Sequence, residues 1–230
     1  MKINQSQVDQ LYLFTRQHFV EYYDLQTELV DHLANAIEAQ WQLTPSRTFD
    51  EALQIEFKKF GVFGFSDVVQ KRHVALEKKY RKIVWGHFKT FFQLPQIIGT
   101  FSAVGILFLM LKMSSNSILI FSILLGLVVI YYFFELFRNV RIRNRTNKDR
   151  PRKWLFKEIL TGYRQSAGLV FLPLQILVHF RTIFDNDYIL FLGSFLLISL
   201  ALYQYIVSII IPNKAEQYLI ETYPEYEFSK

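Results

Sequence analysis

Three side chains that could coordinate a metal or move a proton fall within five residues, namely Glu28, Asp31 and His32. Residues four apart lie on one side of a helix, so Glu28 and His32 would be neighbours there. A carboxylate beside a histidine can bind a metal or transfer a proton. The sequence has no HExxH motif and no evident third ligand, so we expect neither a metal site nor a catalytic site. A polar contact inside a helical domain and an interface for a protein partner remain as interpretations.

A second polar pair, Gln175 and His179, interrupts an apolar stretch. The two residues are four apart and would share one helix face. Polar groups inside a membrane cost free energy unless they are paired, so they are candidates for a functional site. An interhelical hydrogen bond is the interpretation we favour, and a substrate or proton site is the alternative.

The chain offers no other chemistry of its own. It contains no cysteine, which excludes a disulfide framework, a thiolate nucleophile, a Cys-ligated zinc site and an iron–sulfur cluster. No motif indicates a cofactor. We therefore expect a protein that is not an enzyme and binds no cofactor.

Charge and apolar residues are unevenly distributed along the 230 residues, of which 51% are hydrophobic. Between positions 94 and 137 the only charged side chains are Lys112 and Glu135. About 20 apolar residues in a helix cross the hydrocarbon core of a bilayer. We predict an integral membrane protein with four spans, at about 95–112, 117–138, 165–181 and 187–211.

The first 80 residues are less apolar and predict a soluble helical domain. One helix is expected to start at Ser6 and another near Asp24, whose apolar residues recur every four positions as Leu25, Leu29, Leu33, Ile37 and Trp41. Thr48 and Glu51 form a capping-box pattern that predicts a third helix, which Gly61 should end. A long fourth helix should begin near Asp67.

The predicted fold class is all-α, with an N-terminal cytoplasmic helical bundle followed by a polytopic α-helical membrane domain of about four spans. The bundle occupies residues 1–80, and an amphipathic interfacial connection rich in aromatic and cationic residues occupies 81–94. Transmembrane hairpins at 95–138 and 165–211 flank a basic loop at 139–164. The acidic, tyrosine-rich tail at 212–230, with a possible helix cap at Asn213, could fold back onto other parts of the chain or remain disordered.

A run of cations sets the expected orientation in the membrane. One acid, Asp149, accompanies eight basic residues: Arg138, Arg141, Arg143, Arg145, Lys148, Arg150, Arg152 and Lys153. By the positive-inside rule this loop and both termini are cytoplasmic, and we expect a multi-pass protein of a bacterial inner membrane. The polar N-terminus predicts no cleavable signal peptide.

Three partners could account for this basic loop. Anionic lipid headgroups are the partner we favour, since each surface cation gains about 1 kcal/mol from them. A cytoplasmic protein is the second. Direct binding of nucleic acid is not expected, because no aromatic residues alternate with the cations.

Two further contacts are expected within the spans. Glu135 lies one turn before Arg138 and predicts an ion pair on a helix surface. Gly99 and Ala103 form a small face on the first span that would allow another helix to approach closely. That packing could occur within one chain or between copies in a homo-oligomer.

Part of the N-terminal domain resembles a known family. The segments YYDLQTELVDHL at 22–33, FDEAL at 49–53 and KFG at 59–61 resemble the HAAS-type helical domain. In that family the helical domain precedes membrane spans, in proteins associated with PadR-type transcription regulators or before permease domains. The resemblance, which covers about residues 1–80, implies a membrane-anchored regulatory or signalling component.

Two functions follow as hypotheses. In the first, the protein is a non-enzymatic interaction component whose cytoplasmic helical domain binds a protein partner. In the second, it is a small transporter or an accessory subunit of a membrane transport or export complex, for which Gln175 and His179 are the main support.

Overall fold

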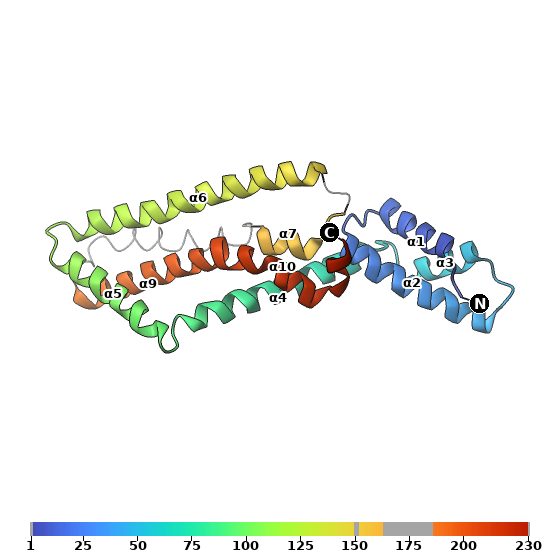
Figure 1. The fold of residues 1–230 in the computed structure, drawn as a ribbon, viewed down its shortest axis with the longest axis horizontal. Coiled ribbons are helices and arrows are strands. Elements are labelled where there is room, and N and C mark those ends of the chain that lie inside the picture. The colour runs from blue at the N-terminus through green and yellow to red at the C-terminus, as the bar shows by residue number, and fades with distance from the viewer. Residues whose placement is uncertain (1, 150–151, 163–185, 230) are drawn as a thin grey trace.

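The computed structural model describes residues 2–149, 152–162 and 186–229, and within these residues all regular structure is helical (Figure 1). This confirms the all-α fold class for the described part of the chain. A π-helical turn, η2 (Ile206–Ile210), links the last two α-helices, and a 3-10 helix, η3 (Pro224–Ser229), follows them. The α-helices are α1 (Gln5–Gln17), α2 (Tyr23–Leu43), α3 (Phe49–Lys58), α4 (Ser66–Thr90), α5 (Gln96–Lys112), α6 (Ser117–Asp149), α7 (Leu155–Thr161), α9 (Asp187–Tyr205) and α10 (Ile211–Thr222).

Local capping explains where the first helices begin and end. The predicted capping box of α3 is confirmed, since the Thr48 hydroxyl accepts the Glu51 amide at 3.3 Å and the Glu51 carboxylate accepts the Thr48 amide at 3.1 Å. Gly61 has a φ of +74°, the left-handed conformation that favours glycine after a helix. The prediction that α1 starts at Ser6 is wrong, because Asn4 caps the helix through the Gln7 amide.

The N-terminal helices share a buried core centred on α2. Helices α1 and α3 both pack on α2, and the five apolar residues of its four-residue repeat are all buried. Helix α4 then runs without a break through the expected boundary at residue 80 as far as Thr90. Leu76, Tyr80 and Val84 form its buried side, so one helix joins the N-terminal helices to the apolar part of the chain.

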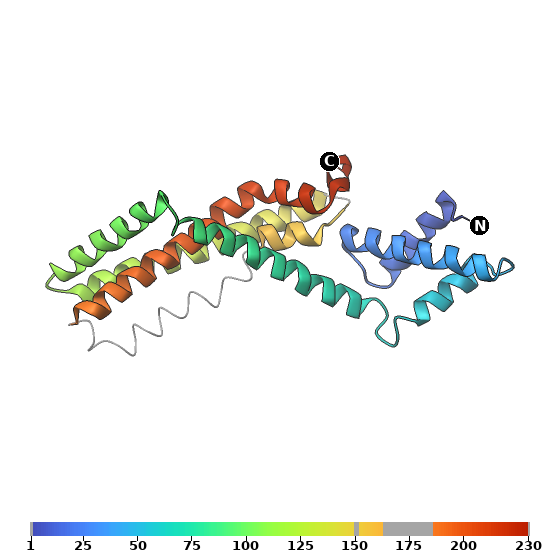
Figure 2. The same ribbon diagram turned by 90° about the horizontal axis from the view of Figure 1, so that it is seen from below.

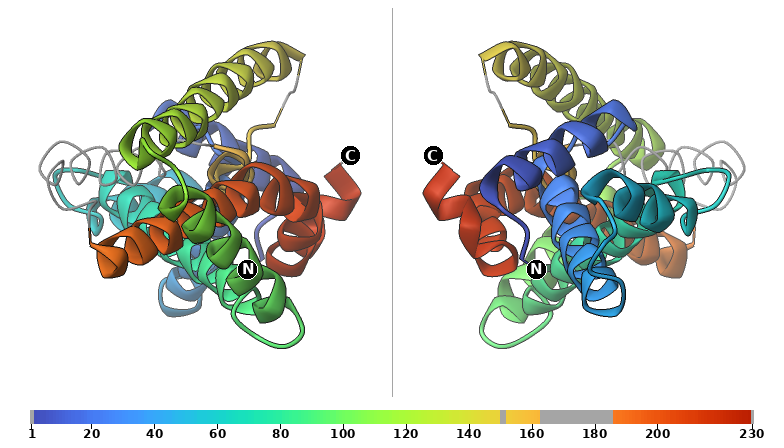
Figure 3. Two further views of the ribbon diagram at one scale, coloured as in Figure 1. Left: turned by 90° about the vertical axis from the view of Figure 1, so that its left-hand side faces the viewer. Right: turned by 90° about the vertical axis from the view of Figure 1, so that its right-hand side faces the viewer.

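The molecule is elongated, with the N-terminal helices at one end and the turn between α5 and α6 at the other (Figure 1). Viewed from below, α4 extends from the N-terminal helices toward α5 (Figure 2). The end-on views place α6 along one edge and the end of α4 along the opposite edge (Figure 3). Between the two ends, α7 and α10 pack against each other, close to the start of α2 (Figure 1).

Two helical segments are long and apolar enough to cross a membrane, Ser117–Arg141 in α6 and Asp187–Thr222 through α9, η2 and α10. Helix α5 matches the predicted first span in position, but its 17 residues are fewer than a typical crossing needs. The predicted span at 165–181 lies outside the described residues. The described structure thus contains two candidate spans of the four that the sequence predicts.

The outward surface of α6 fits a location in lipid. Large apolar side chains, including Ile123, Ile130 and Phe137, are exposed along its length. A continuous apolar surface of this kind is unfavourable in water and marks a membrane or protein contact.

The α5 end of the molecule has its own apolar cluster, formed by Leu107, Leu111, Phe121, Leu125, Leu190 and Leu197 from α5, α6 and α9. Helix α5 packs along α9 there. At the same end the Lys112 ammonium pairs with the Asp187 carboxylate at 2.5 Å.

The last span is expected to end at residue 211, but the chain stays helical beyond that position. Helix α10 continues directly from η2, so the expected helix cap at Asn213 is wrong. Pro212 lies in the first turn of α10, where a missing backbone N–H costs little. The tail is folded, because Tyr223 and Tyr226 are buried.

Candidate interaction site

The three chemistry-bearing residues of α2 do not converge on one site. Glu28 Oε2 pairs with Arg72 Nε of α4 at 3.1 Å. The His32 ring meets the Phe60 ring edge-on at a centroid distance of 6.1 Å, and Asp31 is exposed. Within the described residues no group of three or more possible metal ligands occurs. For Glu28, the arrangement corresponds to the polar contact inside the helical domain, while Asp31 and His32 stay accessible from outside.

The small face predicted on the first span does not pack within the described chain. Gly99 is exposed, and a Cβ atom added there would meet nothing within 4 Å. The buried side of α5 instead carries Thr100, Val104, Leu107 and Leu111, and Ala103 is half-buried. Close packing of another helix at Gly99 and Ala103, within the chain or between copies, therefore stays a prediction. Gln175 and His179 lie outside the described residues.

Glu135 is the clearest difference from the expected surface arrangement. Its ion pair with Arg138 is confirmed, with Oε2 and Nη2 2.7 Å apart. The surface location is wrong, because Glu135 is only 1% exposed. Gln204 of α9 is buried as well, and its Nε2 atom has no hydrogen-bond partner within the described structure.

The last two cations of the basic loop contact the N-terminal helices. The Arg152 guanidinium lies over the Tyr23 ring, 4.4 Å from its centroid. Lys153 Nζ pairs with Glu21 Oε2 at 3.0 Å. Arg141 is exposed near the end of the apolar part of α6. The side chains of Arg143, Arg145, Lys148 and Arg150 lie outside the described part of the chain.

Asp24, which no sequence pattern singles out, joins the N-terminal helices to α7. Its side chain is 1% exposed and caps the start of α7, which is far away in the sequence. Oδ1 accepts the Leu155 amide at 3.1 Å, and Oδ2 accepts the Phe156 amide at 3.2 Å. A carboxylate at a helix N-terminus satisfies free amides and interacts favourably with the helix dipole. Trp154, the residue before α7, makes no side-chain cap. Asp24 caps α7 instead.

Burial raises the pKa of Asp24, and the amide donors of Leu155, Phe156 and Leu25 oppose that rise. A second hydrogen bond crosses the same junction, since the Tyr22 hydroxyl donates to Glu158 Oε2 at 2.8 Å. Burial is also the largest cause that raises the pKa of Tyr22. The Tyr23 amide completes the junction by donating to the Lys153 carbonyl at 2.7 Å.

Aromatic side chains from three parts of the chain surround this capped helix. The buried Trp154 ring packs against Tyr23, Tyr223 and Tyr226, with centroids 5.3, 5.7 and 5.1 Å away. Lys157 Nζ donates to the Tyr226 hydroxyl at 2.5 Å. We call residues 21–24, 152–158 and 223–226 the junction. It connects the N-terminal helices, α7 and the C-terminal tail through buried residues that include Asp24, Trp154 and Tyr226.

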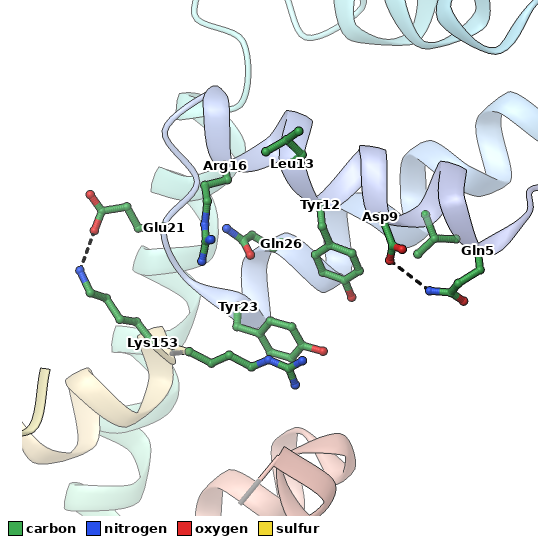
Figure 4. A pocket seen from close by; sticks show the side chains of 11 residues that line it. Gln5, Asp9, Tyr12, Leu13, Arg16, Glu21, Tyr23, Gln26 and Lys153 are labelled. Atoms are coloured by element: carbon green, nitrogen blue, oxygen red, sulfur yellow. Dashed lines mark hydrogen bonds and ion pairs between the residues drawn. The ribbon is translucent and has the colours of Figure 1, made fainter. Parts of the chain in front are cut away.

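A cleft of about 870 Å³ opens beside the junction, between α1 and residues 152–153. Tyr12 and Tyr23 lie nearly parallel there, with ring centroids 5.9 Å apart. The Arg16 side chain extends toward Gln26 and Tyr23, and Lys153 meets Glu21 at one side of the cleft (Figure 4). The cleft combines aromatic faces with cations, a combination that suits recognition of a ligand.

No protein-family model matches this chain, and neither the curated proteins nor the solved structures contain a match to it.

Proposed function

We propose that this protein is a non-enzymatic membrane component with a regulatory or signalling role, whose N-terminal helices bind a protein partner on the cytoplasmic side of a bacterial inner membrane. The resemblance to HAAS-type domains supports this role. The junction supports it further, because it links a partner-binding domain physically to the helices that continue into the apolar segments.

The observation that carries the proposal is a group of exposed apolar side chains at two neighbouring turns. Val62 and Phe63, between α3 and α4, are 98% and 72% exposed, and Phe19, between α1 and α2, is 90% exposed. The turns adjoin, since the His18 ring lies 6.0 Å from the Phe65 ring. Phe19 also has a φ of +64°, an unfavourable conformation for a bulky residue that turns its ring outward. Exposed apolar groups of this kind mark protein contacts.

Copurification from native membranes in mild detergent tests the proposal. We expect one partner at constant stoichiometry with the full-length protein, and its loss in the double variant Val62→Asp/Phe63→Asp. Leu43→Asp is the matched control, because Leu43 is equally exposed but lies at the far end of α2. Recovery of the protein alone, or a partner that the double variant retains, would contradict the proposal.

A transport role is the second candidate, and the buried Glu135 and Gln204 favour it. Phe121 of α6 and Leu190 of α9 belong to one apolar cluster. Glu135 lies fourteen residues after Phe121 on α6, and Gln204 lies fourteen residues after Leu190 on α9. Because the two helices run in the same direction (Figure 1), both polar residues lie about 21 Å further along, at a similar depth. Buried polar residues in apolar spans commonly belong to substrate or ion pathways.

Reconstituted vesicles with a trapped pH indicator test this second function. A transporter should show proton or solute-coupled flux that Glu135→Gln reduces, whereas Asp50→Asn, a change at an exposed residue of α3, should not affect it. Flux that is absent, or identical in both variants, would remove this candidate.

A further inference from the structure

The cleft between α1 and residues 152–153 carries an inference of its own, independent of partner binding. Its cationic side chains come from two regions far apart in the sequence: Arg16 from α1, and Arg152 and Lys153 from the segment before α7. Two carboxylates, those of Asp9 and Glu21, also line it. Whether the cleft attracts an anion depends on which of these charges are already engaged.

One carboxylate and one cation pair with each other, while the second carboxylate accepts a hydrogen bond from a neutral amide and keeps its charge. Asp9 Oδ1 accepts a hydrogen bond from Gln5 Nε2 at 3.2 Å, and Glu21 pairs with Lys153 at 3.0 Å (Figure 4). By contrast, Arg16 and Arg152 form no ion pair within the described residues. Both side chains are exposed, so two guanidinium groups are available to a ligand.

The position of Arg152 prepares it for binding. Its guanidinium stacks on Tyr23, which in turn lies parallel to Tyr12. Stacking holds the guanidinium plane in place while its N–H groups at the edge stay free to donate. Guanidinium groups bind phosphate oxygens through paired, charge-assisted hydrogen bonds.

We propose that this cleft binds a phosphate group through Arg16 and Arg152, with the phosphate supplied by a soluble phosphate ester or by a lipid headgroup. The volume of the cleft lies in the range of small-molecule sites. A phosphate held by both arginines connects α1 to the segment that precedes α7, so it stabilises the junction beside it.

Calorimetry on the full-length protein in nanodiscs of neutral phosphatidylcholine tests the soluble source, with inorganic pyrophosphate as the probe. Wild-type protein should bind it, and Arg16→Gln or Arg152→Gln should each weaken binding about tenfold or more, because each removes a charge-assisted contact. Arg81→Gln is the matched control, since Arg81 is an exposed arginine of α4 outside the cleft. It should change the affinity less than about twofold.

The lipid source is tested by hydrogen exchange in nanodiscs that contain phosphatidylglycerol. Protection of α1 and residues 152–156 relative to neutral nanodiscs, lost in the Arg16→Gln/Arg152→Gln double variant, supports the proposal with a headgroup as ligand. Pyrophosphate binding that the arginine variants do not change would overturn it, as would the absence of both effects. Unchanged melting temperatures of the variants establish that they are folded.

Discussion

At the residue scale, one buried carboxylate has the largest structural role. Asp24 lies in the first turn of α2, yet two of its hydrogen bonds go to amides of α7. Because α7 is short and its own N-cap residue, Trp154, makes no side-chain cap, these amides would otherwise be buried without a partner. Asp24 therefore stabilises its own helix and a distant one simultaneously.

Replacing Asp24 should loosen the junction. We expect Asp24→Ala to destabilise the contact between α2 and α7 by about 2 kcal/mol, because it leaves buried amides without an acceptor. Hydrogen exchange of the Leu155 and Phe156 amides should accelerate accordingly. Asp50→Ala, at an exposed acid in the first turn of α3, should leave that exchange unchanged. Equal exchange in both variants would mean that the cap does not hold α7.

At the element scale, α4 is the helix that joins the parts of the molecule. It contacts α7, η2 and α9, and its last turns meet α10 through His87, whose Nε2 lies 2.6 Å from the Tyr218 hydroxyl. Lys79 adds a hydrogen bond to Thr222 at 2.8 Å. Burial, reinforced by the nearby Lys214 charge, lowers the pKa of His87.

The contact between α4 and α10 should depend on pH. Since the folded protein holds the His87 proton less tightly than the unfolded chain, the unfolded state binds more protons below about pH 6.5. The free energy of unfolding therefore falls as the pH decreases through this range. Hydrogen exchange in α10, corrected for the intrinsic rate, should increase between about pH 7 and about pH 5. His87→Gln should remove most of this dependence, and a variant that keeps it would show that another group is responsible.

At the scale of the whole molecule, the structure is long and has chemically different ends. The N-terminal helices carry polar surfaces and share one buried core with α7, η2 and α10. By contrast, α6 exposes apolar side chains, and Asp187–Thr222 is long and apolar enough to cross a membrane. The orientation expected from the cations places the α5–α6 turn outside and the N-terminal helices inside the cell.

Single-cysteine labelling tests this orientation directly, because the chain has no native cysteine. Ser115→Cys in the α5–α6 turn should react with a membrane-impermeant maleimide in intact spheroplasts. Gln42→Cys at the exposed end of α2 should react only after lysis. Labelling of the Gln42→Cys variant in intact spheroplasts would show that the N-terminal helices are outside.

Local sequence patterns predicted most of the helices. The sequence alone predicted the α3 capping box, the break after that helix at Gly61 and the buried four-residue repeat of α2. Each of these depends on residues within one or two turns. The predicted caps at Ser6 and Asn213 were wrong. Asn4 caps α1 in place of Ser6, and at Asn213 the helix simply continues. Helix ends are decided by such small local differences.

The sequence by itself thus determined the all-helical class and the apolar stretches, since composition and periodicity act over short distances. Only the tertiary structure decided that Asp24 caps a helix 131 residues away, that Glu135 is buried, and that the tail packs on Trp154. The junction and the cleft consist of residues separated by more than a hundred positions. Contacts between such residues follow no local period, because they arise from how the helices pack against one another.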